Sequence, residues 1–472
     1  MADGPILLWF RRDLRLGDHA ALTAAAQSGR AVLPVFIHDE TTARLGAAPK
    51  YRLGLAIAAL EASLQGLGAR LILRQGDALE VLQGLIHETG AKAVYWSRYY
   101  EPAHIARDTR VKAALKAGGI EARSFAGSIL FEPGSVLNGA GKPYAVFTPF
   151  WRAIRMRDPG APLPAPAQLR APSGWPRGDN LDDWHMSAAM QRGARVLRPH
   201  LRIGEDAALD RLAGFLAQDL PQYARARDFP ARAGTSGLSE NLAWGEISAR
   251  QIWWAALNTG FGAPESGAEK FLSELGWREF AWHLMAHNPD LARKSWRAGW
   301  DGFGWRGDNA DAESWRRGMT GITLVDAGMR ELYVTGRMHN RVRMVVASYL
   351  TKHLLTDWRI GLGWFEDCLV DWDPAANAMG WQWVAGSGPD AAPYFRVFNP
   401  DLQAQRFDPD GSYRNRYIAE GQATPPPEAL AYFDAVPRGW QLRPDQPCPK
   451  PRAALAEGRE KALKALKAFN NQ

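Results

Sequence analysis

The sequence predicts an α/β domain built on a parallel sheet, followed by an all-α domain, in a chain of 472 residues. Three observations lead to this prediction. Short apolar runs alternate with amphipathic stretches up to about residue 130, and a segment rich in Pro, Gly and Arg follows. Beyond that segment, apolar residues recur at helical spacing and no strand-like run stands out. The length also exceeds what one ordinary core serves, which favours roughly two or three domains.

The first domain, residues 1–130, contains four apolar runs that we expect to be strands: PILLWF, AVLPVFI, ARLILRQ and AKAVYWS. Helical patterns such as YRLGLAIAALEASLQGLG lie between them. This alternation predicts a Rossmann-like parallel sheet with right-handed helical crossovers. The first run continues into RRDLRLGDH and lacks the G-x-G-x-x-G turn that holds a pyrophosphate, so we expect no dinucleotide site there.

Residues 131–204 are predicted to be an interdomain linker, because RDPGAPLPAPAQLRAPSGWPRGDN has no clear period. Residues 205–472 are predicted to be all-α, with helical patterns that include ALDRLAGFLAQDL and NRVRMVVASYLTKHLL. A literal G-x-G-x-x-G occurs at Gly302, Gly304 and Gly307, but it follows no strand pattern. We interpret this match as chance.

Composition narrows the class of protein. The net charge is +7, from 57 basic and 50 acidic residues, which is mild for this length although the basic residues cluster. Cys368 and Cys448 are too few for a disulfide framework, and alone they cannot form a zinc or iron-sulfur site, so no metal is predicted. The N-terminus has no signal-peptide pattern and no long apolar span occurs, so we expect a cytosolic protein without export or membrane insertion.

The segment from Asp371 to Asn399, DWDPAANAMGWQWVAGSGPDAAPYFRVFN, is too polar and broken for a plain core helix and indicates a binding site. On a helix, Trp381 and Trp383 would lie about 200° apart and face opposite ways, whereas on a strand they would share a face. The preceding ANAMG favours the helix. One ring would then face a buried aromatic cofactor and the other an aromatic partner outside.

Three further motifs have two interpretations each. The segment from Gly234 to Ser239, GTSGLS, offers hydroxyls and backbone amides to a phosphate, or Ser239 is an ordinary N-cap. Glu274, Trp277 and Arg278 share one helical face and could grip and stack on a base. Spacing alone favours a surface Glu/Arg pair beside a half-buried Trp.

The third motif, RMHNRVRM, places Asn340 and Met344 on one helical face, with Arg337, Arg341 and Arg343 nearby. Three arginines in one helical segment indicate a phosphate-binding surface. A solvated basic face explains the same pattern equally well.

Together, GTSGLS, FLSELGWREF, RMHNRVRM and DWDPAANAMGWQWVAGSGPDAAPYFRVFNP, with the N-terminal LLWFRRDLRLGDHAAL, resemble the photolyase and cryptochrome flavoproteins along nearly the whole chain. The resemblance implies an α/β antenna-chromophore domain followed by a helical domain that binds FAD. It also implies DNA as the partner. Members of the iron-sulfur branch need four cysteines, so the two present here exclude that branch.

The resemblance assigns cofactor contacts by motif. Asp371 and Asp373 should border the isoalloxazine ring, and Arg343 should pair with Asp371. Asn377 should lie next to flavin N5, where photolyases carry Asn, plant cryptochromes Asp and animal cryptochromes Cys, so this residue favours repair over signalling. The FAD phosphates and ribityl chain should contact Tyr223, Thr235, Ser236, Gly237, Leu238 and Ser239.

Trp381, Trp358 and Trp305 match the tryptophan chain of the family, which passes electrons from the surface to the flavin. Each ring alone could be a core residue. The joint match in separate motifs favours the chain.

The implied lesion pocket determines which damage is repaired. Six-four photoproduct repair requires proton transfer, and relatives specialised for it carry histidines where this chain has Asn340 and Met344. A cyclobutane pyrimidine dimer needs no external proton, because one injected electron splits the ring. We therefore predict dimer repair, with His339 as a structural residue. The residues expected to bind the flipped dimer or DNA are Glu274, Trp277, Arg278, Asn340, Arg341, Met344, Trp383 and Gln403.

The main alternative is a cryptochrome photoreceptor, which would have a long regulatory tail and a changed residue at Asn377; a dark flavin oxidoreductase would usually need a nicotinamide site. We expect a bacterial monomer without an obligate protein partner, cytoplasmic and with the nucleoid when it binds DNA. A second, antenna chromophore is expected. Its identity stays open between a folate, a deazaflavin and none, because Ala103 and His104 replace the Asn-Glu pair of folate-binding photolyases.

Overall fold

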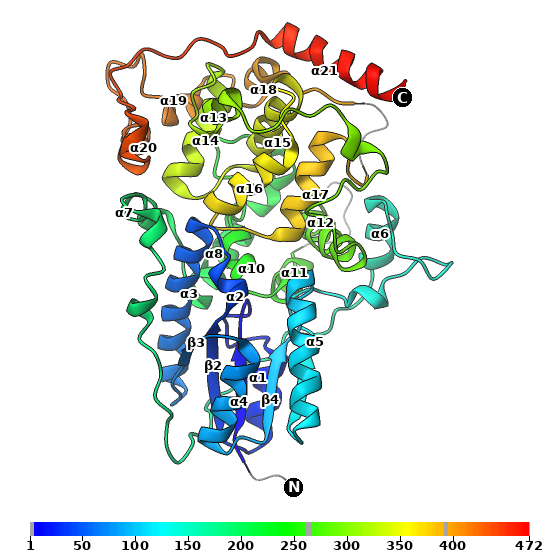
Figure 1. The fold of residues 1–472 in the computed structure, drawn as a ribbon, viewed down its shortest axis with the longest axis vertical. Coiled ribbons are helices and arrows are strands. Elements are labelled where there is room, and N and C mark those ends of the chain that lie inside the picture. The colour runs from blue at the N-terminus through cyan, green and yellow to red at the C-terminus, as the bar shows by residue number, and fades with distance from the viewer. Residues whose placement is uncertain (1–3, 260–266, 391–394, 472) are drawn as a thin grey trace.

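The computed structural model describes residues 4–259, 267–390 and 395–471, arranged as an α/β part below a helical part in Figure 1. The sheet is parallel, with strand order β3-β2-β1-β4-β5. The prediction of a Rossmann-like sheet is therefore confirmed. The strands are β1 (Ile6–Phe10), β2 (Val32–His38), β3 (Ile72–Gln75), β4 (Ala93–Ser97) and β5 (Glu121–Phe125).

Both faces of the sheet are covered, which explains why its three central strands, β2, β1 and β4, are largely apolar runs. Alternate residues of β1 enter two cores: Ile6 and Leu8 pack with α1 (Ala20–Gln27) and α3 (Ala47–Gly66) on one face. Leu7 packs on the other face with the remaining long helices of this part, α4 (Ala78–Thr89) and α5 (Pro102–Ala117). The short α2 (Glu40–Ala43) follows β2.

The connecting region between residues 131 and 204 contains α6 (Phe147–Ile154), α7 (Gly193–Leu197) and 3-10 turns. The stretch between α6 and α7 runs along the surface of the α/β part. The Val32 amide donates to Arg170 O at 3.0 Å, and the Asp179 amide donates to Leu73 O at 2.9 Å. The predicted domain limits of 130 and 204 stay predictions.

From residue 205 onward, the described residues form helices and no strand, which confirms the all-α prediction. The helices are α8 (Glu205–Gln218), α9 (Tyr223–Ala226), α10 (Ser239–Trp244), α11 (Ala249–Leu257), α12 (Gly267–His287), α13 (Ala310–Arg316), α14 (Thr323–Thr335), α15 (Asn340–Ser348), α16 (Trp358–Cys368), α17 (Pro374–Ala385), α18 (Pro400–Phe407), α19 (Ser412–Tyr417), α20 (Pro427–Ala435) and α21 (Leu455–Asn470), with a π-helical turn at Tyr349–His353.

A buried ion-pair network joins the two parts. Arg52 of α3 is fully buried, and its Nη1 and Nη2 donate to the two carboxylate oxygens of Glu246 at 2.9 and 2.6 Å. Its Nε also lies 3.6 Å from Glu240 Oε2, on α10. Removing one partner would leave a buried charge uncompensated, so this network holds α10 in a fixed place against the α/β part.

Candidate functional site

Helix α17 forms the centre of the site, and the prediction that Trp381 and Trp383 lie on a helix is confirmed. Asp373 caps the helix by accepting the Ala376 amide at 2.9 Å, and Pro374 occupies the first helical position. Trp381 is buried, while Trp383 is half-buried and its Nε1 donates to Asp390 O at 3.1 Å. Residues 391–394 of the predicted segment lie outside the described residues.

The carboxylates of this segment meet the basic motif of α15. Arg343 Nη2 donates to Asp371 Oδ2 at 2.8 Å, so the predicted ion pair is present. Asp371 Oδ1 is buried and accepts no hydrogen bond from the residues described. Asn377 is also buried, and its Nδ2 donates to Asp373 O at 3.0 Å. The site thus contains a buried acceptor that is free to receive a ligand N–H or O–H.

A second group of polar side chains, from α12, contacts Asp373. Trp282 Nε1 donates to Asp373 Oδ2 at 3.0 Å, and Arg278 Nε lies 3.5 Å from the same oxygen. Arg278 Nη1 also donates to Glu279 Oε1 at 3.2 Å. Burial raises the pKa of Glu279 to about 7, despite the opposing charge of Arg278. Arg278 therefore lies beside Asp373, and its predicted role in DNA binding stays a prediction.

The GTSGLS segment lies against α9. A Cβ on Gly234 would come within 2.7 Å of Ala226 Cβ, so only glycine allows this close approach. Gly237 has φ +63, and Arg211 donates to its carbonyl. Leu238 occupies the N-cap position of α10, so the alternative that Ser239 caps this helix is wrong.

The hydroxyl-bearing residues of that segment remain available to a ligand. Thr235 and Ser239 are exposed, and Ser236 is half-buried. Tyr223, in contrast, is buried against Phe215 and Phe271, with ring centroids 5.5 Å away from each. The cofactor contacts predicted for these residues stay predictions.

The three tryptophans of the predicted electron chain run from the interior to the surface. Trp381 packs on Phe365 of α16, with ring centroids 5.0 Å apart, and Trp358, fully buried, begins the same helix. Trp305 is half-buried, and the Asp357 amide, directly before Trp358, donates to Arg306 O at 3.0 Å. This hydrogen bond joins the segments that carry Trp305 and Trp358, which are distant in sequence, and the electron-chain role of the three tryptophans stays a prediction.

Glu274 and Trp277 each have a partner that the sequence did not indicate. Glu274 pairs with Arg227 of the segment after α9 and with Lys270, whose Nζ lies 2.8 Å away. Burial favours the neutral acid, but Arg227 and Lys270 outweigh it and lower the pKa of Glu274, which keeps this carboxylate ionised at neutral pH. Trp277 stacks on Phe147 with ring centroids 3.7 Å apart and an interplanar angle of 9°.

The motif on α15 presents Asn340, which is exposed, and Met344, which is half-buried. Arg341 Nη2 lies 2.8 Å from Asp228 Oδ2, so this guanidinium is not simply solvated. His339 is the N-cap of α15, because its Nδ1 accepts the Arg341 amide at 3.2 Å. Burial lowers the pKa of His339 to about 4, so the ring is neutral near pH 7. Gln403 of α18 is half-buried, and its Oε1 accepts no hydrogen bond from the described part of the chain.

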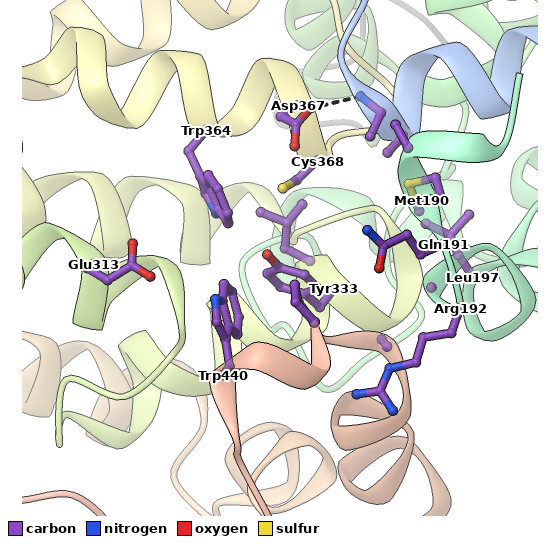
Figure 2. A pocket seen from close by; sticks show the side chains of 17 residues that line it. Met190, Gln191, Arg192, Leu197, Glu313, Tyr333, Trp364, Asp367, Cys368 and Trp440 are labelled. Atoms are coloured by element: carbon purple, nitrogen blue, oxygen red, sulfur yellow. Dashed lines mark hydrogen bonds between the residues drawn. The ribbon is translucent and has the colours of Figure 1, made fainter.

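A separate cavity of about 360 Å³ lies between the start of α3, the connecting region and helices α14 and α16. Figure 2 shows Trp364 and Trp440 on two sides of it, with Tyr333 and Gln191 nearby. Tyr333 contacts both indoles, with ring centroids 6.1 Å from Trp364 and 5.3 Å from Trp440. No local sequence motif indicates this cavity, because its aromatic residues come from separate segments of the chain.

A smaller cavity of about 160 Å³ lies where β1 and β2 end, and Ala103 and His104 line it. Ion pairs cross this region: Arg107 Nη1 lies 2.5 Å from Asp39 Oδ2, and Arg11 Nη1 lies 2.6 Å from Asp108 Oδ2. The segment singled out for the antenna chromophore therefore borders a small, charged space.

Comparison with known proteins decides the family. Residues 6–167 match the family model described as DNA photolyase, and residues 271–468 match the FAD binding domain of DNA photolyase. A deoxyribodipyrimidine photo-lyase of Agrobacterium fabrum is 46% identical over 417 residues, which are 88% of this chain and 87% of that protein. The chain belongs to the DNA photolyase family. The predicted resemblance is confirmed.

Other relatives of this photolyase agree. The structure of a bacterial class III photolyase from Agrobacterium tumefaciens matches with a TM-score of 0.92 and 43% identity, covering 100% of this chain and 99% of that one. Cryptochrome-1 of Arabidopsis thaliana is 34% identical over 437 residues, but these are 88% of this chain and only 63% of that protein. No helix among the residues described in this photolyase is long and apolar enough to cross a membrane.

FAD is the cofactor of this photolyase domain, and the residues at the site fit it. The orphan Asp371 Oδ1 suits a ribityl hydroxyl or a ring N–H. Arg343 holds the other oxygen of this carboxylate at 2.8 Å, which fixes its orientation. The exposed hydroxyls of Thr235 and Ser239 suit a phosphate.

Proposed function

We propose that this photolyase splits cyclobutane pyrimidine dimers in DNA by light-driven electron transfer. The observation that carries this proposal is the chemistry of the lesion pocket, which offers an ionised acceptor at Glu274 and no acid at Asn340 or Met344. FAD, when bound, would itself be the light-driven electron donor. Dimer splitting needs this electron and no external proton, so the pocket suits it.

The protein side chains bind and orient the flipped dimer. Glu274 accepts a hydrogen bond from a base N–H, because Arg227 and Lys270 keep it ionised. Trp277 and Trp383 flank the two bases, and Asn340 offers an amide to the second base edge. Arg341 exchanges Asp228 for a DNA phosphate, since its guanidinium lies at the half-buried surface.

The cofactor side of the site is preorganised by charge. Asp371, held by Arg343, and the Asp373 cap of α17 orient the flavin, and Asn377 offers an uncharged amide beside it. Trp381, Trp358 and Trp305 carry electrons from the surface. Arg278 helps to orient the Asp373 carboxylate, because its Nε lies 3.5 Å from Asp373 Oδ2.

Repair by the purified protein tests the proposal directly. Oligonucleotides with one cyclobutane dimer should be repaired under blue or near-ultraviolet light and not in darkness, whereas a six-four photoproduct should persist. Absence of repair under light by enzyme with reduced FAD would favour the cryptochrome alternative. Turnover in darkness would contradict both and favour a flavin oxidoreductase.

We further infer that the protein works as a monomer without an obligate protein partner, in the bacterial cytoplasm and with the nucleoid when DNA is bound. Residues 1–130, 131–204 and 205–472 would be the α/β domain, the linker and the catalytic domain. Light scattering on the holoprotein, with and without dimer DNA, tests the monomer.

The antenna chromophore is best accommodated by the cavity of Figure 2. Its volume of about 360 Å³ suits a small heteroaromatic ligand, whereas the cavity beside His104 measures about 160 Å³. Trp364 and Trp440 offer faces for stacking a planar ring. Gln191, with φ +48, offers a polar group beside them in a backbone conformation typical of functional sites.

An absorption spectrum tests this location. Trp364→Leu should remove the absorption of a second chromophore while FAD stays bound, and Trp254→Leu, at a surface position outside both cavities, should not. A second chromophore retained at full occupancy by Trp364→Leu would place it elsewhere.

A further inference from the structure

Phe147 lies against one of the two tryptophans proposed to flank the dimer. Its ring stacks on Trp277 at 3.7 Å with an angle of 9° between the planes, although the two residues belong to different segments. Phe147 is buried and begins α6, in the connecting region, which no motif linked to the lesion pocket. A ring stacked on one face of Trp277 leaves the other face for a base and restricts rotation of the indole.

The backbone of Phe147 also reaches the second tryptophan. Its amide donates to the Asp390 carboxylate, and the Asp390 carbonyl accepts Trp383 Nε1 at 3.1 Å. Asp390 has φ +50, in the left-handed region that non-glycine residues seldom adopt. Asp tolerates this region better than most non-glycine residues, and the two hydrogen bonds on Asp390 help to hold it there.

Helix α6 is itself firmly anchored, so it can hold a neighbour in place. Phe150 packs on Phe280 of α12, with ring centroids 5.2 Å apart. Trp151 lies so close to α12 that a Cβ on Gly276 would come within 2.6 Å of its ring. Gly276 directly precedes Trp277 and Phe280 follows it by three residues, so α6 contacts α12 both before and after Trp277.

We propose that Phe147 is a positioning residue for the lesion pocket, which sets Trp277 through its ring and Trp383 through its amide and Asp390. This rests on the proposed function, in which these two tryptophans flank the dimer. Preorganised rings lose less rotamer freedom when the dimer enters, and that difference strengthens lesion binding without a contact between Phe147 and DNA.

Dark binding of the FAD-loaded protein to dimer DNA and to undamaged DNA tests the proposal. Phe147→Leu should weaken dimer binding about threefold to tenfold, the usual worth of a stacked aromatic pair. Binding of undamaged DNA and the flavin spectrum should not change, because phosphate contacts dominate the former. The backbone amide is present in both variants, so the comparison tests the ring, and Phe147→Tyr, which keeps the ring, should bind dimers like wild type.

Two further variants separate positioning from general packing. Phe150→Leu, on the same helix, removes a ring that anchors α6 on Phe280 and His283 but does not stack on Trp277, so it should weaken dimer binding less than Phe147→Leu does. In a Trp277→Leu background, Phe147→Leu should weaken dimer binding little or not at all, because the ring that Phe147 stacks on is gone and the backbone amide of residue 147 is the same in both variants.

Unchanged dimer binding in Phe147→Leu, or equal loss in Phe147→Leu and Phe150→Leu, would overturn the positioning role. So would full additivity with Trp277→Leu. A wild-type protein that fails to distinguish dimer DNA from undamaged DNA would instead contradict the proposed function itself, so the two failures are distinguishable.

Discussion

Substitution of Gly361 by Ala should displace the innermost tryptophan of the electron chain. A Cβ at this position would lie 2.1 Å from Trp381 Cη2 and 2.4 Å from Cζ3. The ring must therefore retreat by about 1.3 Å to restore an ordinary contact near 3.4 Å. Trp381 is only 3% exposed and is enclosed by Trp315 and Phe365, so little room exists for this shift.

Overpacking of this kind costs about 1–3 kcal/mol of stability. Gly363→Ala is the matched control, because it lies on the same helix and its Cβ would meet no atom within 4 Å. Both variants gain about 1 kcal/mol of helix propensity, so their difference isolates the steric cost. Urea unfolding should place Gly361→Ala about 1–3 kcal/mol below Gly363→Ala.

Photoreduction of the oxidised flavin supplies the second assay. Gly361→Ala should photoreduce more slowly than wild type, since the moved ring changes the first transfer distance, and Gly363→Ala should match wild type. Equal stabilities of the two variants together with a wild-type photoreduction rate in Gly361→Ala would refute the reasoning.

Three further predictions follow from the site. Trp305→Phe should slow photoreduction of the oxidised enzyme in a flash experiment, yet enzyme reduced beforehand should repair dimers normally; loss of repair in that enzyme would contradict the electron-chain role. Glu274→Gln should weaken dimer binding about tenfold in a dark titration, because a charge-assisted hydrogen bond becomes a neutral one, and unchanged affinity would exclude Glu274 from the pocket. Burial raises the pKa of Glu279 to about 7, so this group adds stability at low pH that is lost as pH rises towards 7, by about 3 kcal/mol in total. Glu279→Gln should remove this decline in urea unfolding between about pH 4.5 and 7.5, and an identical pH profile would show that Glu279 does not titrate there.

Much of the fold could be predicted because its signals are local. Four strands are apolar runs, since both faces of the sheet are buried. The fifth strand, EARSF, was missed because it lies at the sheet edge, where most of its residues are exposed or half-buried and its composition is polar. The helices after residue 204 could be predicted from the helical spacing of their apolar residues, and tertiary contacts did not override this local preference.

The sequence by itself determined the family and the two domain types, because these depend on motifs whose residues lie close together along the chain, and the pairing of Arg343 with Asp371 followed only from the family resemblance. Only the tertiary structure decided what each site residue touches. It turned Arg278 towards Asp373, placed Phe147 on Trp277 and formed an aromatic cavity from Tyr333, Trp364 and Trp440. These contacts join residues distant in sequence through packing of whole helices, and a local pattern carries no record of which helix faces will meet.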